Sequence, residues 1–190
     1  IIKLHCNDTR EDTIEKMTEA IDFADIIICT GGVSVGDRDL VKPVLEDDLK
    51  VETILWKIAI KPGKPVYFAR KQEKYFFGLP GNPVSAMVTF HLFVKPALLK
   101  LQGITPNEPS LTKAILSRKI KKKAGRMEFV RGIQKRTKDD TLVVEPTRGQ
   151  ESHMLSGLAS ANCLIHFNLE DELLDENSKV EIQKLNWQKY

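Results

Sequence analysis

The residue types best suited to chemistry gather in the stretch TGGVSVGDRD, residues 30–39, which directly follows an apolar run. Glycines allow positive backbone φ angles and let amide groups approach a ligand closely, and a serine adds a hydroxyl donor. A loop of this kind before a helix can receive a phosphate or another anion. Tight strand-to-helix turns also use glycine for geometry alone, so both interpretations stay open. The candidate ligand-binding residues here are Gly31, Gly32, Ser34 and Gly36.

The same loop carries two carboxylates, Asp37 and Asp39, and a third, Asp8, follows the apolar run at 1–6. Carboxylates repel phosphate unless a cation lies between the two. Their hard oxygens suit Mg²⁺, whose shell a phosphate oxygen can complete. The alternative is structural, with Asp39 capping the next helix and Asp37 pairing with Arg38.

Two further motifs offer groups that bind anions. In WKIAIKPGK, Lys57 and Lys61 would fall on one face of an extended strand, where they suit an anionic ligand or, alternatively, a solvated sheet edge. In GLPGNPVSA, Asn82 is a natural N-cap, and we expect free amides at the helix start to form a second anion site. The candidate residues of this second motif are Pro80, Gly81, Asn82, Pro83 and Ser85.

Hydrophobic periodicity predicts the elements that would position these groups. A strand at 1–6, an amphipathic helix at 9–24 capped by Thr9, and a strand at 25–30 form a βαβ unit with parallel strands. We further expect the following elements: a helix at 39–48, a strand at 53–60, a hairpin of 65–70 with 74–79, and a helix at 82–103 with Pro96 at a kink or docking point.

Ligands bind beyond the carboxyl ends of parallel strands. If the strands ending near 6, 30 and 79 are parallel, Asp8, the loop at 30–39 and the loop at 80–85 converge on one sheet edge. After a linker at 104–110 the pattern changes to short strands with turn signals between them, which predicts a small β-barrel or sandwich. These strands are expected at 111–118, 127–136, 141–147, 161–167 and 178–186.

Composition excludes several classes of protein. The chain has 190 residues, 42% hydrophobic and 29% charged, with a net charge of +3 that is too small to indicate nucleic acid. No apolar run approaches the roughly 20 residues that span a bilayer. Cys6, Cys29 and Cys163 are widely spaced, which favours free thiols over a metal site. We therefore expect a cytoplasmic protein that binds neither nucleic acid nor membrane.

The motifs GGVSVGDRD, WKIAIKPGKP, GLPGNPVSA, GRMEFVRG and QESH, taken in this order, resemble the MoeA family of molybdopterin molybdenumtransferases, which includes the E domain of gephyrin. The resemblance implies an α/β molybdopterin-binding domain of three layers with a mostly parallel sheet at 1–103, and a small C-terminal β-barrel at 104–190. It also implies that the chain corresponds to the C-terminal half of such a protein. The family's first strand and helix, with the sequence TGDEL, would then precede Ile1.

The implied activity inserts molybdenum from molybdate into adenylylated molybdopterin, with Mg²⁺-dependent release of AMP, in a homodimer. By resemblance, Asp8 and Asp39 match acidic residues of the family's site and would hold Mg²⁺, and Lys57 and Lys61 match its lysines. The matches also include Pro80 and Pro83 as paired prolines, and Arg131 and Ser152 as an Arg and a Ser contributed by the β-domain. Glu151 stands where the family commonly has glycine.

Two other functions remain compatible with parts of the sequence. A molybdopterin adenylyltransferase shares the glycine and Pro-Gly-Asn-Pro motifs, but it resembles only the first domain and has no β-barrel. A scaffold module like that of gephyrin would be favoured by the basic stretch KIKKK at 119–123.

Overall fold

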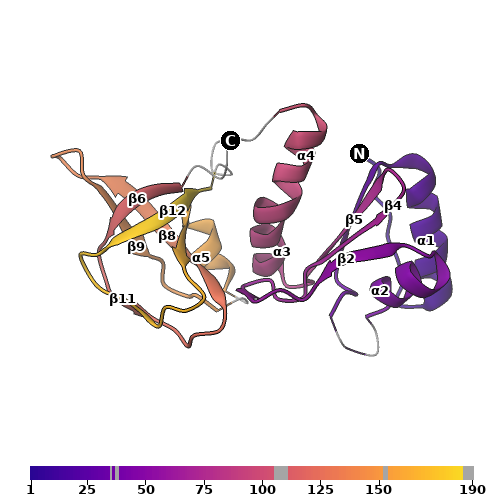
Figure 1. Ribbon diagram of the computed structural model, residues 1–190, viewed down its shortest axis with the longest axis horizontal. Coiled ribbons are helices and arrows are strands. Elements are labelled where there is room, and N and C mark those ends of the chain that lie inside the picture. Colours follow the sequence, from indigo (N-terminus) through magenta and orange to yellow (C-terminus); the bar gives the residue numbers. More distant parts are fainter. Residues whose placement is uncertain (35, 37–38, 105–110, 152–153, 186–190) are drawn as a thin grey trace. The chain divides into compact units, whose positions relative to one another are not determined.

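The structure, a computed structural model, divides into two compact units (Figure 1). The first unit comprises residues 1–58 and 63–90, and the second comprises 59–62 and 91–190. The domain boundary expected between residues 103 and 104 stays a prediction. The described residues are all except 35, 37–38, 105–110, 152–153 and 186–190.

The first unit contains a four-stranded sheet with the order β1-β5-β4-β2. Its strands are β1 (Ile26–Thr30), β5 (Lys74–Leu79), β4 (Tyr67–Lys71) and β2 (Glu52–Trp56). Only β1 and β5 are parallel, and the β5–β4 and β4–β2 pairs are antiparallel. The sheet is therefore mixed rather than mostly parallel, because the predicted hairpin supplies two of its four strands.

Helices cover both faces of this sheet. Helix α1 (Arg10–Phe23) begins as expected, with the Thr9 hydroxyl accepting from the Asp12 amide. The short α2 (Val41–Pro43) continues into a π-helix, η1 (Val44–Asp48). Met17 of α1 and Leu45 of η1 pack against the sheet, and α3 (Pro83–Thr89) lies on the opposite side (Figure 1). The unit thus has the three α/β layers that the sequence predicts.

The strand expected at residues 1–6 does not form. These residues have no regular secondary structure, and Ile1, Ile2 and Leu4 are exposed. An apolar run becomes a strand only where a sheet edge pairs with it, and β5 is the one described strand that pairs with β1. The βαβ unit predicted for residues 1–30 is therefore wrong, although its helix and its second strand are present.

The single strand expected at 53–60 is also wrong. Strand β2 ends at Trp56, and Lys57 takes a positive φ of 57°, which breaks the extended backbone. The next strand, β3 (Ile60–Lys61), belongs to the second unit and pairs with β8 there. The alternation of apolar residues continues across this break, so periodicity alone could not reveal the change of sheet.

The predicted helix at 82–103 is present as three consecutive segments, namely α3, the π-helix η2 (Phe90–Val94) and α4 (Lys95–Leu101). Pro96 lies in the first turn of α4, directly after the π-turn, where a missing amide proton is tolerated. By length and composition the 19-residue stretch Pro83–Leu101 could cross a membrane, so the expectation that no apolar run approaches that length is wrong. Core helices of soluble proteins pass the same test.

The second unit contains a closed five-stranded barrel, as expected. Its strands follow the order β10-β12-β6-β9-β8, and β8 pairs back with β10. Inward-facing residues of all five strands form an apolar core that includes Leu116, Val144 and Ile182. The elements are β6 (Leu111–Leu116), β8 (Met127–Arg136), β9 (Leu142–Pro146), β10 (Cys163–Phe167) and β12 (Lys179–Lys184), with the short pair β7 (Ile120–Lys121) and β11 (Leu173–Leu174), and helix α5 (Leu155–Ala159).

Candidate functional site

The loops that follow β1 and β5 meet at the carboxyl ends of these two parallel strands. The Gly31 amide donates to the Leu79 carbonyl over 2.9 Å. A Cβ atom on Gly81 would lie 3.5 Å from Gly31 Cα, and Gly31 itself has a φ of 86°. The two backbones are thus in contact, and the positive φ of Gly31 is a conformation that favours glycine. Two of the three loops expected at this edge therefore converge.

The loop after β1 is held in place by one buried apolar side chain and by backbone hydrogen bonds. Val33 is buried and packs against Gly78 of β5, where a Cβ atom would come within 2.4 Å of the Val33 side chain. The Trp56 indole donates to the Val33 carbonyl over 3.1 Å. The Gly32 carbonyl accepts from the Val41 amide at 3.1 Å, which ties the loop to α2. The loop is thus held through its backbone and one apolar side chain, while Ser34 and Gly36 remain exposed.

Asp39 closes a turn inside the loop rather than capping the helix. Its carboxylate accepts from the Gly36 amide at 2.6 Å, and its own amide donates to the Gly36 carbonyl at 2.9 Å. The N-cap of α2 is Leu40, which has no side chain that could bond to the helix amides. Among the described residues the carboxylate accepts this one hydrogen bond, which leaves acceptor capacity for a ligand. Asp37 lies outside the described residues.

Lys57 and Lys61 do not share a face. The Lys57 ammonium lies 3.9 Å from the centre of the Trp56 ring, and the indole of Trp56 holds the Val33 carbonyl. This cation–π contact keeps a cation beside the loop after β1. Lys61 lies in the second unit, where its ammonium is 3.3 Å from the Glu128 carboxylate. The expected pairing of the two lysines on one strand face is therefore wrong, because the chain leaves the sheet between them.

Asn82 occupies the amides that were expected to bind a second anion. Its side-chain oxygen accepts from the Val84 amide at 3.1 Å and from the Ser85 amide at 3.2 Å. The N-cap is confirmed, and it uses two of the donors at the helix start. Pro80 and Ser85 are buried, whereas Gly81 and Pro83 are exposed. An anion at this helix would compete with the cap for those amides.

Asp8 is exposed just before the N-cap of α1. The described contacts do not join it to the loop of Asp39, because the strand that was to position it is absent. Within the described part of the chain, no group of three or more His, Cys, Asp or Glu residues could hold a metal ion. The pairing of Asp8 with Asp39 on Mg²⁺ stays a prediction.

Arg131 of β8 lies in the second unit, where its side chain is 1% exposed. Its guanidinium donates through Nη2 to the carbonyls of Gly149, at 2.8 Å, and Glu151, at 3.3 Å. The side chain of Gln150 bonds to both the amide and the carbonyl of Arg131. These bonds fix the segment that precedes Ser152, which lies outside the described residues.

Two other nitrogens of this guanidinium, Nε and Nη1, are buried without a hydrogen-bond partner among the described residues. Burial lowers the pKa of Arg131. The family resemblance implied Arg131 as a ligand-binding residue but gave no role to Gln150, whose bonds to Arg131 depend on the loop that places it against β8. The role of Arg131 in ligand binding stays a prediction.

Comparison with known proteins identifies the family. Residues 2–100 match the family described as "Probable molybdopterin binding domain", and residues 113–185 match "MoeA C-terminal region (domain IV)". A molybdopterin molybdenumtransferase of Haemophilus influenzae is 38% identical over 193 residues, covering 97% of this chain and 47% of that protein. The Drosophila melanogaster molybdenum cofactor synthesis protein cinnamon is 42% identical over 163 residues, covering 84% of this chain and 26% of that protein.

A solved structure agrees with these matches. The crystal structure of the MoeA molybdopterin biosynthesis protein of Pyrococcus horikoshii superposes with a TM-score of 0.74 at 26% identity, covering 96% of this chain and 43% of that one. The chain spans about half the length, or less, of the relatives that it matches. Which part of them it corresponds to stays a prediction. Two family models that match in order over most of the sequence establish that the chain belongs to the molybdopterin-binding-domain family, in its MoeA group.

Proposed function

We propose that this protein acts in molybdenum cofactor biosynthesis as a molybdopterin molybdenumtransferase, which inserts molybdenum from molybdate into adenylylated molybdopterin and releases AMP. The names of its relatives support this activity. The closed barrel favours it over an adenylyltransferase, which would lack that domain. We further propose a cytoplasmic homodimer, to be tested by fractionation and by analytical ultracentrifugation of the complete gene product.

The observation that carries the proposal is the close approach of Gly31 and Gly81 at the carboxyl ends of β1 and β5. The absence of side chains at Gly31, Gly32 and Gly81 would let a phosphate-bearing ligand approach main-chain amides at this edge of the sheet. Lys57 supplies a cation beside one of these segments and Asp39 supplies a carboxylate. The remaining proposed ligand-binding residues are Gly32, Ser34, Gly36, Pro80, Asn82, Pro83, Ser85, Arg131 and Ser152, with Asp8 and Lys61 as further catalytic groups.

Mg²⁺ fits this loop only as an ion shared with the substrate. Mg²⁺ in phosphate-handling sites is commonly held by one or two carboxylates together with substrate phosphates and water. Asp39, whose carboxylate bonds to one amide, can contribute one oxygen, and Asp8 is the proposed second ligand. If bound there, the ion would neutralise charge on the two linked phosphates of the substrate, of which one leaves in AMP and the other stays on the molybdopterin. The aspartates are thus proposed to bind the cation. The amides of Gly32 and Gly81 are proposed to orient the phosphate, because the Gly31 and Gly36 amides already donate to the Leu79 carbonyl and the Asp39 carboxylate.

The structure sharpens the choice of mutation at Asp39. Asp39→Asn keeps a side-chain oxygen that can accept from the Gly36 amide, so the turn is retained while the charge is lost. Asp39→Ala removes both. We expect neither variant to release AMP from adenylylated molybdopterin in the presence of molybdate. The melting temperature of Asp39→Asn should equal that of the parent protein.

The assay uses the complete gene product and measures AMP and cofactor by chromatography. Asp48→Asn, at an acidic residue in η1 that pairs with Arg10, is the matched control and should keep full turnover. Unchanged turnover in Asp39→Asn would remove this carboxylate from the mechanism. No turnover by the parent protein under any Mg²⁺ concentration would overturn the proposed activity.

A further inference from the structure

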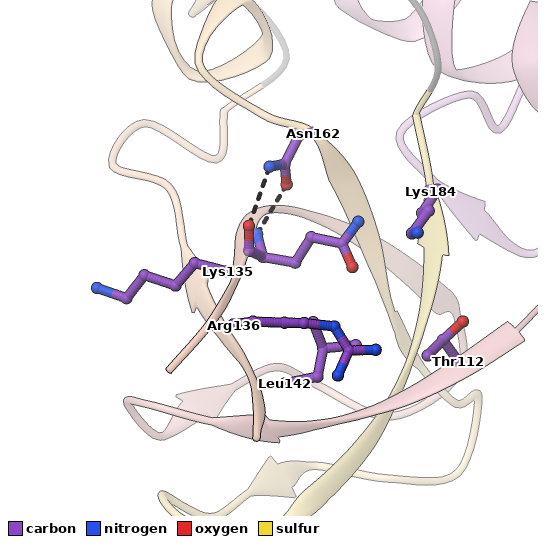
Figure 2. A pocket seen from close by; sticks show the side chains of 7 residues that line it. Thr112, Lys135, Arg136, Leu142, Asn162 and Lys184 are labelled. Atoms are coloured by element: carbon purple, nitrogen blue, oxygen red, sulfur yellow. Dashed lines mark hydrogen bonds between the residues drawn. The ribbon is translucent and has the colours of Figure 1, made fainter. Parts of the chain in front are cut away.

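The open end of the barrel contains a pocket of about 330 Å³ that no part of the proposed function uses. Figure 2 shows side chains from β6, β8, β9 and β12 around it. Barrel mouths are common places for small-molecule sites, and this volume lies within the usual range for ligand pockets. We propose that this mouth pocket binds a small anionic molecule that also carries a hydrogen-bond donor.

The pocket is a continuation of the barrel's inward-facing rows. Side chains alternate between the two faces of a strand, so residues two positions beyond a core residue face inward again. Ala114 on β6, Val144 on β9 and Ile182 on β12 are buried in the core. Two residues further toward the mouth, the inward position is polar on β6 and β12 and apolar on β9. The inward residues at the mouth are Thr112 on β6, Gln134 and Arg136 on β8, Leu142 on β9 and Lys184 on β12.

The floor of the pocket is closed. Gly132 is the inward residue of β8 just below Gln134, and a Cβ atom there would contact Val144 at 2.9 Å and Cys163 at 3.2 Å. Val144 and Cys163 are fully buried. The rows therefore end in a packed layer with polar side chains above it, so a ligand could enter only from the open end.

The charges at the mouth favour an anion. Arg136 of β8 and Lys184 of β12 line the pocket, and the described lining residues include no carboxylate. Arg136 uses its Nη1 for the side chain of Asp140, at 3.0 Å, whereas Lys184 forms no ion pair with any described residue. Lys135 points away from the pocket in Figure 2, as its outward position in β8 requires. Two inward cations, one of which has no ion-pair partner in the described part of the chain, would suit an oxyanion.

The side chain of Gln134 calls for a hydrogen-bond donor on the proposed ligand. Its backbone amide and carbonyl are both bound by the Asn162 side chain, at 2.7 and 3.1 Å, which fixes the residue in the wall. Its side-chain oxygen Oε1 is buried and has no hydrogen-bond partner among the described residues. Buried acceptors are usually satisfied, and leaving one unpaired is costly. A ligand with a hydroxyl or amine beside its phosphate or carboxylate would meet both needs once the Gln134 side chain turns this buried oxygen toward the pocket.

The test is a titration of the isotopically labelled chain, followed by NMR, with glycerol 3-phosphate as the probe. We expect saturable shifts at the backbone amides of Thr112, Gln134 and Lys184. Lys184→Met, which keeps the length of the side chain, should raise the dissociation constant about tenfold or more because a charge-assisted contact is lost. Lys179→Met is the matched control, since Lys179 is an exposed lysine at the other end of the same strand and faces outward.

Sulfate is the second probe, because it carries the charge but offers no donor. It should bind several-fold more weakly than glycerol 3-phosphate, and Gln134→Leu should abolish that difference. Equal affinity for the two probes in the parent protein would overturn the donor requirement. An equal loss in Lys179→Met and Lys184→Met, or shifts confined to residues 30–40 and 80–85, would overturn the mouth pocket itself.

Discussion

The loop after β1 and the surroundings of Arg131 hold their polar groups in opposite ways. In the loop, backbone bonds and the buried Val33 fix the chain, while Asp39 and Lys57 stay accessible to solvent. In the barrel the charge itself is buried and ties a loop to β8. Exposed charges contribute little to stability and can be changed without loss of the fold, whereas a buried charge is structural first. The two regions should therefore respond differently to mutation.

The largest expected effect comes from Arg131→Ala. It removes two hydrogen bonds to loop carbonyls and leaves a cavity beside the barrel core, so we expect a loss of about 3–5 kcal/mol in the free energy of unfolding. Native-state hydrogen exchange of the β8 and β10 amides measures this loss within the second unit. A loss below 1 kcal/mol in the free energy of unfolding would show that the hydrogen bonds of Arg131 do not hold the segment 149–151 in place.

Arg131→Met separates packing from charge. Methionine fills most of the volume and removes the two unpartnered nitrogens along with the charge. A buried charge replaced by an apolar group of similar size is often nearly neutral, so this variant should lose at most about 2 kcal/mol. If Arg131→Met were as unstable as Arg131→Ala, the hydrogen bonds to Gly149 and Glu151 would account for the whole effect.

A smaller effect is expected in the loop of the first unit. Gly32 has a φ of 70°, and a Cβ atom there would lie 2.7 Å from the Val41 side chain. Gly32→Ala should cost about 2–3 kcal/mol, from backbone strain of about 1–2 kcal/mol and the added overpacking. The measurement is hydrogen exchange of the β1 and β5 amides.

Gly103→Ala is the matched control for this substitution. Gly103 has a φ of 74°, but nothing lies within 4 Å of its Cβ position. It should therefore show the backbone strain alone. Equal losses in both variants would mean that Val41 moves aside freely, and the loop after β1 would then be less rigid than its contacts indicate.

Local chemistry was predictable from the sequence and long-range pairing was not. Thr9 and Asn82 cap their helices as expected, because a cap depends on three or four neighbouring residues. The hairpin of β4 and β5 and the barrel strands were equally clear from alternation and turns. The strand expected at 1–6 failed because no described strand pairs with it, and the one at 53–60 failed because Lys57 breaks the backbone.

In the candidate site, too, local features were predictable from the sequence and long-range contacts were not. The meeting of the loops at Gly31 and Gly81 follows from the parallel pairing of β1 and β5, which from the sequence was only a condition for the expected convergence. The use of Asp39 on the Gly36 amide and the burial of Arg131 depend on how loops fold back over distant elements. Residue type and spacing identified the groups, and tertiary contacts decide which of them remain accessible to a ligand.

The last expected effect concerns acid, and it extends the comparison to a second buried group. His91 lies in η2 with 7% of its surface exposed, and burial, reinforced by the charge of Lys95, lowers its pKa to about 4. The unfolded chain takes up a proton near pH 6.5 and the folded chain does not, so stability is lost as the pH falls from 6.5 toward 4. At pH 5 the loss from this group should be about 2 kcal/mol relative to pH 7.

His91→Gln should reduce the pH dependence of the unfolding free energy by that amount, while some dependence remains because burial also lowers the pKa of His166. Identical pH profiles for the parent and the variant would show that His91 takes up its proton in the folded protein, and the contrast between solvated loop charges and buried polar groups would then rest on Arg131 alone.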